Sequence, residues 1–552
     1  MAEPKENVLM EKIVSLCKRR GFIFQSSEIY GGINGFWDYG PLGAELKRNV
    51  KELWWNTMTR QRDDVVGLEA TIIMSPKIWE ASGHVATFSD PMIDCKTCKG
   101  RFRADQTDEI PCPQRPSKMV SVCHGEKTEA RPFNLMFKTH CGPVESDENI
   151  AYLRPETAQA IFAQFKNVLE TSRQRVPFGI AQVGKAFRNE VTPRNYTFRS
   201  REFEQMELEF FIKPDEVVEA ISGSVASAAD IGRADLPVGQ DARQRVPTTP
   251  QANWGWRLWH QYWVEERVRF YEGIGLSRDT LGFHVQTAKE LAHYARACTD
   301  ILFKFPFSKK DEQGNVTGDE LEGIAARSDF DLSQHARFSG KPMGVFDDEL
   351  RGAWGKLPKE KQDDLWRRYF ENRRNYLSKS GVEAEVAAKQ ATEDANGLAK
   401  GQYIPHVIEP SAGVDRLILA LIANAYSEAT DTDDKGKSET RVILKFHPRV
   451  APVKVGVMPL LKNKPELVKQ AQAVRDLLRP WMNVFYDEAG SIGRRYARQD
   501  EAGTPFCVTI DFDTLGEKPE LLDTVTLRHR DDGRQDRVKI SALLALLLEK
   551  IR

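Results

Sequence analysis

The sequence predicts an α+β protein, in which residues 1–445 form an antiparallel-sheet core with helical insertions and residues 448–552 form an α/β domain with a mixed sheet. Three observations predict this fold class. Residues 178–212 read as a strand, a loop and a second strand with period-2 alternation. Residues 404–426 continue from a strand into an amphipathic helix. After residue 448, short apolar strands alternate with helices, which is typical of an α/β domain.

Composition excludes several classes of protein. The chain has 552 residues and 29% of them are charged, yet the formal net charge is only -1. Nucleic-acid binding would therefore depend on local basic patches. No apolar stretch approaches the ~18 residues of a membrane-spanning helix, and the charged N-terminus lacks the apolar centre of a secretory signal. Eight cysteines in a chain of this length do not make a disulfide framework. We expect a protein of the reducing cytoplasm.

The remaining elements follow in chain order. Leu9, Ile13 and Leu16 recur at helical spacing and predict an N-terminal surface helix. A glycine-rich and aromatic-rich loop at residues 31–43 leads into a helix over Ala44–Thr57. Residues 92–145 form an irregular insertion that holds five of the eight cysteines, residues 311–319 a turn, and residues 340–400 a charged, helix-prone insertion. The polar residues 427–440 predict a linker or flexible loop. In the last domain we expect strands at 454–459, 484–486, 506–511 and 524–530 and a helix at 465–478.

The strand–loop–strand places its side chains on two faces. Met206, Leu208, Phe210 and Ile212 share the face that must be the core, and Phe203, Gln205, Glu207 and Glu209 share the other. Arg188 and Glu190 lie on the first strand, and the arginines Arg194, Arg199 and Arg201 crowd in and after the loop. An amphipathic edge hairpin with a solvated face is one interpretation. The exposed Phe203 and the mutually repelling arginines instead indicate an anion site, because arginine suits bidentate phosphate contact.

The helix after residue 413 gives a second anion signal. Apolar residues recur from Val414 to Ala425 at helical spacing, Ser411 is a plausible N-cap, and Gly413 permits close backbone approach. Asp415 and Arg416 fall in the first turn, where a cation opposes the helix dipole unless an anion binds there. The alternative is that Arg416 pairs with a neighbouring carboxylate.

These segments resemble motifs of the class II aminoacyl-tRNA synthetases. Phe187-Arg188-x-Glu190 with Arg199-x-x-x-Phe203 resembles motif 2, Gly413-Val414-Asp415-Arg416 resembles motif 3, and residues 40–76 more loosely resemble the dimer-forming motif 1. The resemblance implies that Arg188 binds the α-phosphate of ATP, that Arg199 and Arg416 bind the γ-phosphate, and that Phe203 stacks on adenine.

Longer stretches resemble the single-chain, dimeric glycyl-tRNA synthetases along nearly the whole chain. They are GGINGFWDYGPLG from Gly31, WEASGH from Trp79, RFRAD from Arg101, RPETAQ from Arg154, REFEQMELEFF from Arg201 and EPSAGVDR from Glu409. Acidic groups suit a substrate whose only positive handle is its ammonium. A tight pocket can exclude a methyl group sterically, whereas a missing methyl is discriminated by only about 1–3 kcal/mol.

The resemblance implies a full set of site residues. It implies that Arg188 and Arg416 are the catalytic residues. ATP is bound by Arg188, Asn189, Glu190, Phe198, Arg199, Ser200, Arg201, Glu202, Phe203, Glu320, Leu321, Gly413, Val414, Asp415 and Arg416, with Mg²⁺ that Glu320 could ligate. Glycine is bound by Arg103, Glu156, Phe203, Glu204, Gln205, Met206, Glu207, Arg327, Glu409, Pro410, Ser411, Ala412 and Gly413. The implied partners are glycine, ATP, the glycine tRNA and a second copy of the chain.

Two further patterns concern zinc and RNA. Cys95-x-x-Cys98 is half of a zinc knuckle, and Cys112, Cys123, His124 and Cys141 are candidates for the rest, at irregular spacing. A structural zinc held by Cys95, Cys98, Cys112 and Cys123 competes with a reduced, metal-free loop. Residues 448–552 resemble the anticodon-binding domain of class II synthetases, in which Ser491–Arg498 could contact single-stranded bases or merely begin a charged helix.

Three other functions compete with glycine activation. A synthetase for threonine, proline or serine would share the motifs. A catalytically inactive relative would lack the phosphate-binding arginines, yet Arg188, Arg199 and Arg416 are all present. A zinc-dependent RNA-binding protein would explain the cysteines but not motifs 2 and 3.

Overall fold

A computed structural model describes residues 5–108, 110–231, 249–292, 294–311, 313–432 and 438–551. Its centre is a seven-stranded sheet in the order β14-β15-β16-β19-β13-β12-β3. The strands span Leu281–Val285, Ala297–Phe303, Asp319–Ser328, His406–Gly413, Glu202–Ile212, Phe178–Phe187 and Val65–Gly67 in that order. All neighbours are antiparallel except β12 and β3. The predicted antiparallel core is confirmed.

The two faces of this sheet are covered differently. Met206, Leu208, Phe210 and Ile212 of β13 are fully buried against α2 (Pro41–Trp55), α7 (Trp256–Gly273) and α12 (Val414–Ala425). On the other face, α5 (Ala158–Ser172) packs on Phe211 and the start of β12. The predicted core face is confirmed. The solvated interpretation of the opposite face is wrong, because Gln205, Glu207 and Glu209 are all buried.

Two local predictions near α12 are also wrong. Ser411 lies within β19, and the N-cap of α12 is Gly413. The described parts of residues 427–440 are strands rather than a loop: β20 (Tyr426–Thr432) pairs with β21 (Ser438–Leu444) as an antiparallel hairpin, and residues 433–437 of this prediction lie outside the described residues. The hairpin is anchored at its base, where Leu444 is fully buried. Backbone pairing and this buried side chain stabilise the strands although their composition is polar.

The C-terminal region has its own sheet and core. Strands β23 (Val484–Tyr486), β22 (Val455–Pro459) and β24 (Phe506–Ile510) are parallel, and β25 (Thr524–His529) and β26 (Gln535–Lys539) continue the sheet antiparallel. Helices α13 (Pro465–Leu478), α14 (Ile492–Ala502) and α15 (Ile540–Ile551) complete it. The mixed sheet is confirmed, whereas strand β26 and helix α15 were not expected.

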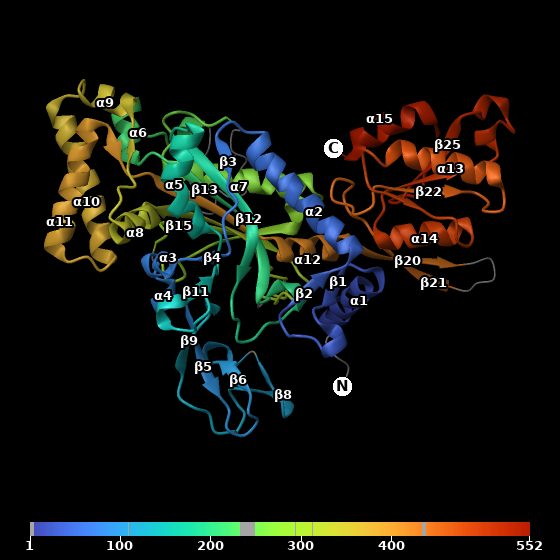
Figure 1. The fold of residues 1–552 in the computed structure, drawn as a ribbon, viewed down its shortest axis with the longest axis horizontal. Helices are drawn as coiled ribbons and strands as arrows, with labels where there is room; N and C mark the ends of the chain where they lie inside the picture. Colours follow the sequence, from blue (N-terminus) through green and yellow to red (C-terminus); the bar gives the residue numbers. More distant parts are fainter. Residues whose placement is uncertain are drawn as a thin grey trace.

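Three parts extend from the core in Figure 1. The cysteine-containing insertion holds β5 (Ser89–Asp94), β6 (Arg101–Arg103), β7 (Pro111–Cys112), β8 (Arg115–Met119) and β9 (Arg131–Asn134). The helical insertion holds α9 (Asp348–Trp354), α10 (Lys359–Lys379) and α11 (Ala384–Gly397), as predicted. The C-terminal domain lies on the opposite side from this helical insertion. None of the described helices combines the length and apolar character needed to cross a bilayer.

Candidate active site

Two neighbouring cavities open where β13, β19 and β16 lie side by side. The first has a volume of about 340 Å³ and the second about 330 Å³. Both are lined by Arg188, Gln205, Glu320 and Ser411, so they adjoin one another. Four arginines line the first cavity beside four carboxylates, whereas the second has six carboxylates and one arginine. The first is therefore the better suited to an anion and the second to a cation.

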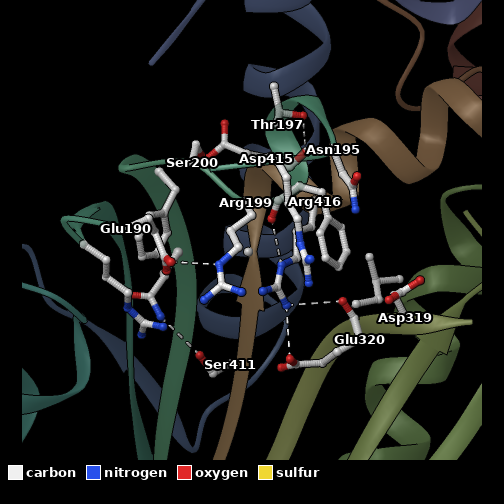
Figure 2. Close-up of a pocket in the computed structure, with 17 residues that line it drawn as sticks. Glu190, Asn195, Thr197, Arg199, Ser200, Asp319, Glu320, Ser411, Asp415 and Arg416 are labelled. Carbon is white, nitrogen blue, oxygen red and sulfur yellow. Dashed lines mark hydrogen bonds and ion pairs between the residues drawn. The ribbon is translucent and has the colours of Figure 1, made fainter. Parts of the chain in front are cut away.

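Four arginines line the first cavity: Arg188, Arg194, Arg199 and Arg416. Arg199 Nε contacts Glu190 Oε2 at 2.8 Å, and Arg416 Nη1 contacts Glu320 Oε2 at 3.1 Å (Figure 2). The Arg416 guanidinium also lies over the Phe198 ring at 4.6 Å. The predicted alternative, that Arg416 pairs with a carboxylate, is thus observed in the unliganded cavity. Because Glu320 is about half exposed, this pair is weak and a phosphate can replace it.

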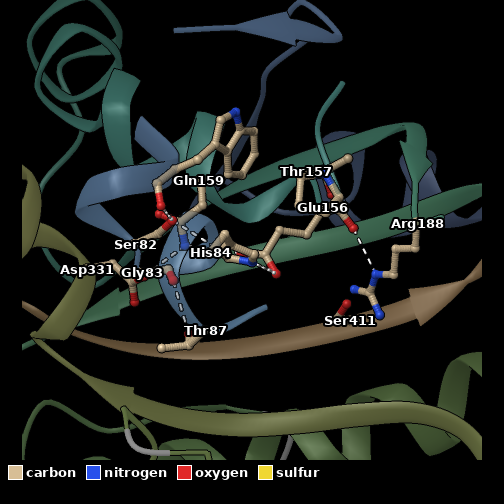
Figure 3. A network of polar contacts seen from close by, with 12 residues as sticks. Ser82, Gly83, His84, Thr87, Glu156, Thr157, Gln159, Arg188, Asp331 and Ser411 are labelled. Carbon is tan, nitrogen blue, oxygen red and sulfur yellow. Dashed lines mark hydrogen bonds and ion pairs between the residues drawn. The ribbon is translucent and has the colours of Figure 1, made fainter. Parts of the chain in front are cut away.

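Arg188 is positioned by one backbone contact and two aromatic rings. Its Nε donates to the carbonyl oxygen of Pro155 at 3.0 Å (Figure 3), and its guanidinium lies 5.3 Å from the Phe203 ring and 5.5 Å from the Phe88 ring. Within the described residues its two terminal nitrogens make no hydrogen bond. Arg188 is therefore a preorganised donor for an anionic oxygen.

Asp415 fixes the start of α12 against the sheet. Its carboxylate accepts hydrogen bonds from Tyr39 at 2.6 Å, from Lys47 at 2.8 Å and from the backbone amide of Glu204 at 2.7 Å. Burial, together with the Asp415 charge, raises the pKa of Tyr39 well above its usual range, so Tyr39 stays a donor. This network sets the direction in which the neighbouring Arg416 points.

Glu156 enters the second cavity from the segment before α5. It contacts His84 Nε2 at 3.3 Å and accepts from Gln159 at 3.1 Å, and His84 in turn contacts Ser82 at 2.8 Å (Figure 3). Burial opposes ionisation of Glu156, but His84 and the nearby arginines outweigh it and lower its pKa below the usual range. Glu156 is therefore a carboxylate at neutral pH.

Glu207 lies at the centre of the same cavity. One of its oxygens accepts from Ser411 at 2.7 Å and the other from the hydroxyl of Thr157. Burial and the charge on Glu156 raise the pKa of Glu207. A cation bound in this cavity would be attracted by the carboxylates of both Glu156 and Glu207.

The third carboxylate, Glu409, is paired with a buried arginine. Arg327 Nη1 contacts both Glu409 oxygens, at 2.8 and 2.9 Å, and its other edge contacts Asp331 at 2.9 Å. The Tyr294 ring lies 3.9 Å from the guanidinium. Burial raises the pKa of Glu409 to about 8, although Arg327 acts in the opposite direction.

Most predicted site residues reach these cavities. The first is lined by Arg188, Glu190, Phe198, Arg199, Ser200, Phe203, Glu320, Leu321, Gly413, Asp415 and Arg416. The second is lined by Glu156, Gln205, Glu207, Glu409 and Ser411, and Arg327 contacts it through Glu409.

The other predicted residues do not line either cavity in the described structure, for physical reasons. Met206, Ala412 and Val414 are buried in the core on the opposite face. Pro410 alternates with Glu409 and Ser411 along β19 and therefore also points away from the cavities. Glu202 pairs with Lys185, and Glu204 with Lys47 and Lys51. Arg201 donates to the backbone oxygens of Asn34 and Glu190, and Arg103 pairs with Asp90 and Asp105. Asn189 is held through its backbone amide by the oxygen of Leu135. Their side chains therefore lie outside the linings of both cavities in the described structure.

Sequence reasoning missed Tyr294, which lines the second cavity, and also His84 and Asp331, which contact Glu156 and Arg327 beside it. His84 closes the motif quoted from Trp79, but its pairing with Glu156 depends on an intervening insertion. Asp331 lies four residues after Arg327, a helical spacing that could have indicated their pairing. Tyr294 lies in a loop that carries no pattern.

The cysteines of the insertion gather in two pairs. The amide of Cys98 donates to Cys95 Sγ at 3.5 Å in the turn between β5 and β6, and Cys112 and Cys123 have their sulfurs 3.5 Å apart. Cys141 is exposed after a strand of a different sheet. Cys17, Cys298 and Cys507 are buried, and Cys298 also lines the second cavity.

Comparison with known proteins gives consistent matches. Residues 137–252 match the family described as the tRNA synthetase class II core domain (G, H, P, S and T), and residues 454–550 match the anticodon binding domain family. A glycine–tRNA ligase of Treponema denticola is 41% identical over 99% of this chain and 98% of its own length. The glycine–tRNA ligase of Streptomyces coelicolor is 40% identical over 98% of each chain, and that of Thermus thermophilus is 39% identical over 98% of this chain and 99% of its own.

Proposed function

We propose how the two cavities work from one premise: the chain belongs to the glycine–tRNA ligase family. The enzyme attaches glycine to its tRNA with consumption of ATP, through a glycyl-adenylate. The first cavity then receives ATP and the second receives the glycine ammonium. The observation that carries this assignment is the adjacency of an arginine-lined cavity and a carboxylate-lined cavity that share Arg188 and Ser411.

The first step needs positioning and charge stabilisation rather than a general base. The glycine carboxylate is already ionised, so its oxygen attacks the α-phosphorus directly and pyrophosphate leaves. Arg188 lies between the two cavities, where it can stabilise the negative charge that grows on the α-phosphate. Arg199 and Arg416 hold the outer phosphates, and Phe203 supports the adenine.

The second step transfers the glycyl group to the tRNA. The terminal ribose hydroxyl attacks the carbonyl carbon of the adenylate and loses its proton to solvent, and AMP leaves with the electrons of the broken acyl–phosphate bond. Throughout both steps Glu156, Glu207 and Ser411 hold the ammonium, and Arg327 keeps Glu409 in place through its bidentate contact.

Magnesium fits the mouth of the first cavity. Asp319 and Glu320 bring carboxylates there, and Glu320 is about half exposed and contacts only Arg416 through its side chain. Carboxylate oxygens together with substrate phosphates are the ligands Mg²⁺ prefers, and when bound it would neutralise charge on the pyrophosphate leaving group.

We also propose that the insertion holds one structural zinc between Cys95, Cys98, Cys112 and Cys123. Its own core is small, because only Ile93, Phe102, Val120 and Cys95 are buried together. A metal held by four thiols would supply the stability that so little apolar burial cannot. Metal analysis should find about one zinc per chain; Cys98→Ser should lose it and Cys141→Ser should keep it. Equal zinc content in both variants would contradict the proposal.

The C-terminal domain matches an anticodon-binding family, and we propose that it contacts the tRNA through its exposed groups rather than through all of Ser491–Arg498. Arg495 is buried and donates to backbone oxygens of Gly490 and Pro459, so it is structural, whereas Arg494 is exposed. A homodimer and a cytoplasmic location stay predictions, and light scattering tests the first.

The substrate assignment is tested by ATP–pyrophosphate exchange with each of the common amino acids separately. Glycine should support exchange, while alanine, serine, threonine and proline should not do so at equal concentration. Exchange with one of these and none with glycine would refute the assignment.

A further inference from the structure

One buried carboxyl beside the second cavity has no role in the steps above. Glu209 follows Glu207 on the same face of β13 and is fully buried. The register pairs Glu207 with Ser411 and Phe210 with Ile408, so Glu209 lies opposite Glu409 on β19. Oxygens of Glu207, Glu209 and Glu409 all lie within 4.8 Å of one another. Three carboxyl groups this close cannot all be ionised in a dry site.

Glu209 is the member of this trio that lacks a partner. Glu409 has the guanidinium of Arg327, and Glu207 has the hydroxyls of Thr157 and Ser411. Neither oxygen of Glu209 has a hydrogen-bond partner within the described ranges. A buried unpartnered carboxylate is costly, whereas a neutral carboxyl group is tolerated.

The charges around Glu209 also favour its neutral, protonated form. The groups that act on Glu209 are Glu207 on its own strand, Glu409 on β19, Arg327 on β16 and Asp331 on α8 (Phe330–Ser339). Three of these four are acidic, and Arg327 is already shared between Asp331 and Glu409. Burial and the Glu409 charge raise the pKa of Glu209 well above its ordinary value.

We propose that Glu209 is a positioning residue of the glycine site whose carboxyl carries a proton in the free enzyme and releases it when the glycine ammonium binds. The ammonium adds one positive charge beside the trio, which makes the fully ionised trio tolerable. The O–H bond of Glu209 breaks, its electron pair stays on the carboxylate, and the proton passes to solvent. Glycine is thereby favoured over a neutral ligand of the same size, because only a cation brings the charge that ionises the trio.

This inference rests on the proposed glycine site, and its test separates the two. Calorimetry with a non-reactive glycyl-sulfamoyl-adenosine, in two buffers of different ionisation enthalpy, counts protons released on binding. The wild-type enzyme should release up to one proton near pH 7.5, and ATP alone should release none. Tight binding without proton release would overturn the inference and leave the proposed function standing, whereas no binding would remove both.

The pH profile assigns the proton to its residue. In wild-type exchange assays the KM for glycine should fall as pH rises from 6.5 to 8.5, by at most about tenfold per pH unit, the limit for one proton. Glu209→Gln keeps a neutral side chain of the same shape, so its KM should vary little with pH while kcat stays close to that of the wild type. Glu216→Gln is the matched control, because it removes another buried carboxyl group, on α6 (Asp215–Ser222), which accepts a hydrogen bond from Asn372. Its KM for glycine should depend on pH as that of the wild type does. If the KM of Glu209→Gln depended on pH as steeply as that of the wild type, the assignment of the proton to Glu209 would be overturned. It would also be overturned if a chelator abolished proton release, because that result would indicate a bound cation instead.

Discussion

Replacing Arg188 with alanine removes the donor that stands between the two cavities. The structure sets the size of the effect: Nε is held at 3.0 Å by Pro155, and the rings of Phe88 and Phe203 lie 5.5 and 5.3 Å away. The guanidinium therefore needs no reorganisation to meet the charge on the α-phosphate. Removing one such preorganised donor costs about 2.7–4 kcal/mol of transition-state stabilisation, or ~10²–10³ in kcat.

Glycine-dependent ATP–pyrophosphate exchange measures this directly. Arg188→Ala should lose ~10²–10³ in kcat while its melting temperature stays close to that of the wild type. Lys185→Ala is the matched control, because Lys185 lies near the end of β12, three residues before Arg188, is about half exposed and pairs with Glu202 outside both cavities. Arg188 itself follows the end of β12 at Phe187, so the prediction that Arg188 and Glu190 lie on that strand is wrong. Arg188→Lys should recover only part of the rate, because lysine cannot make the planar, two-pronged contact. Exchange by Arg188→Ala within about threefold of the wild-type rate, less than ~0.7 kcal/mol, would refute the role of Arg188.

Three further changes test the surrounding structure. Arg327→Met leaves Glu409 and Asp331 buried without their cation and should lower the free energy of unfolding by about 3–5 kcal/mol in urea titrations; an unchanged midpoint would contradict the buried pair. His84→Ala removes the partner of Glu156, worth about 1.5–3 kcal/mol for a hydrogen bond to a charged group, and should raise the KM for glycine by the corresponding ~10–150-fold, with no effect expected on the KM for ATP. Burial lowers the pKa of His406 to about 3, so below about pH 6.5 the unfolded chain binds a proton that the folded chain does not, and stability should fall by up to ~1.4 kcal/mol per pH unit down to pH 3. His406→Leu should reduce this slope, and an unchanged slope would show that other groups cause the acid sensitivity.

The sequence predicted best those site residues whose position depends only on their neighbours along the chain. Period-2 alternation placed Glu207 and Gln205 on one face of β13, and the motif before α12 placed Arg416 in its first turn, because strand and helix geometry follow from neighbouring residues. It also favoured an anion site over a solvated hairpin, and the structure shows that face to be buried.

Partners far apart in the sequence could not be predicted in this way. The pairing of His84 with Glu156 and of Arg327 with Glu409 depends on how insertions return the chain to the sheet. Composition alone also predicted a linker or flexible loop at residues 427–440, whose described residues belong to β20 and β21 and are paired by backbone hydrogen bonds. Local patterns therefore gave the elements, and long-range packing decided which charges meet.

The most direct test of the two-cavity account is a crystal structure of the enzyme bound to the non-reactive glycyl-adenylate analogue. The account predicts that the amine lies within hydrogen-bonding distance of Glu156 and Glu207, that the group replacing the α-phosphate contacts Arg188, and that the adenine lies against Phe203. An analogue bound with its amine toward Asp319 and Glu320, and with the second cavity empty, would contradict it.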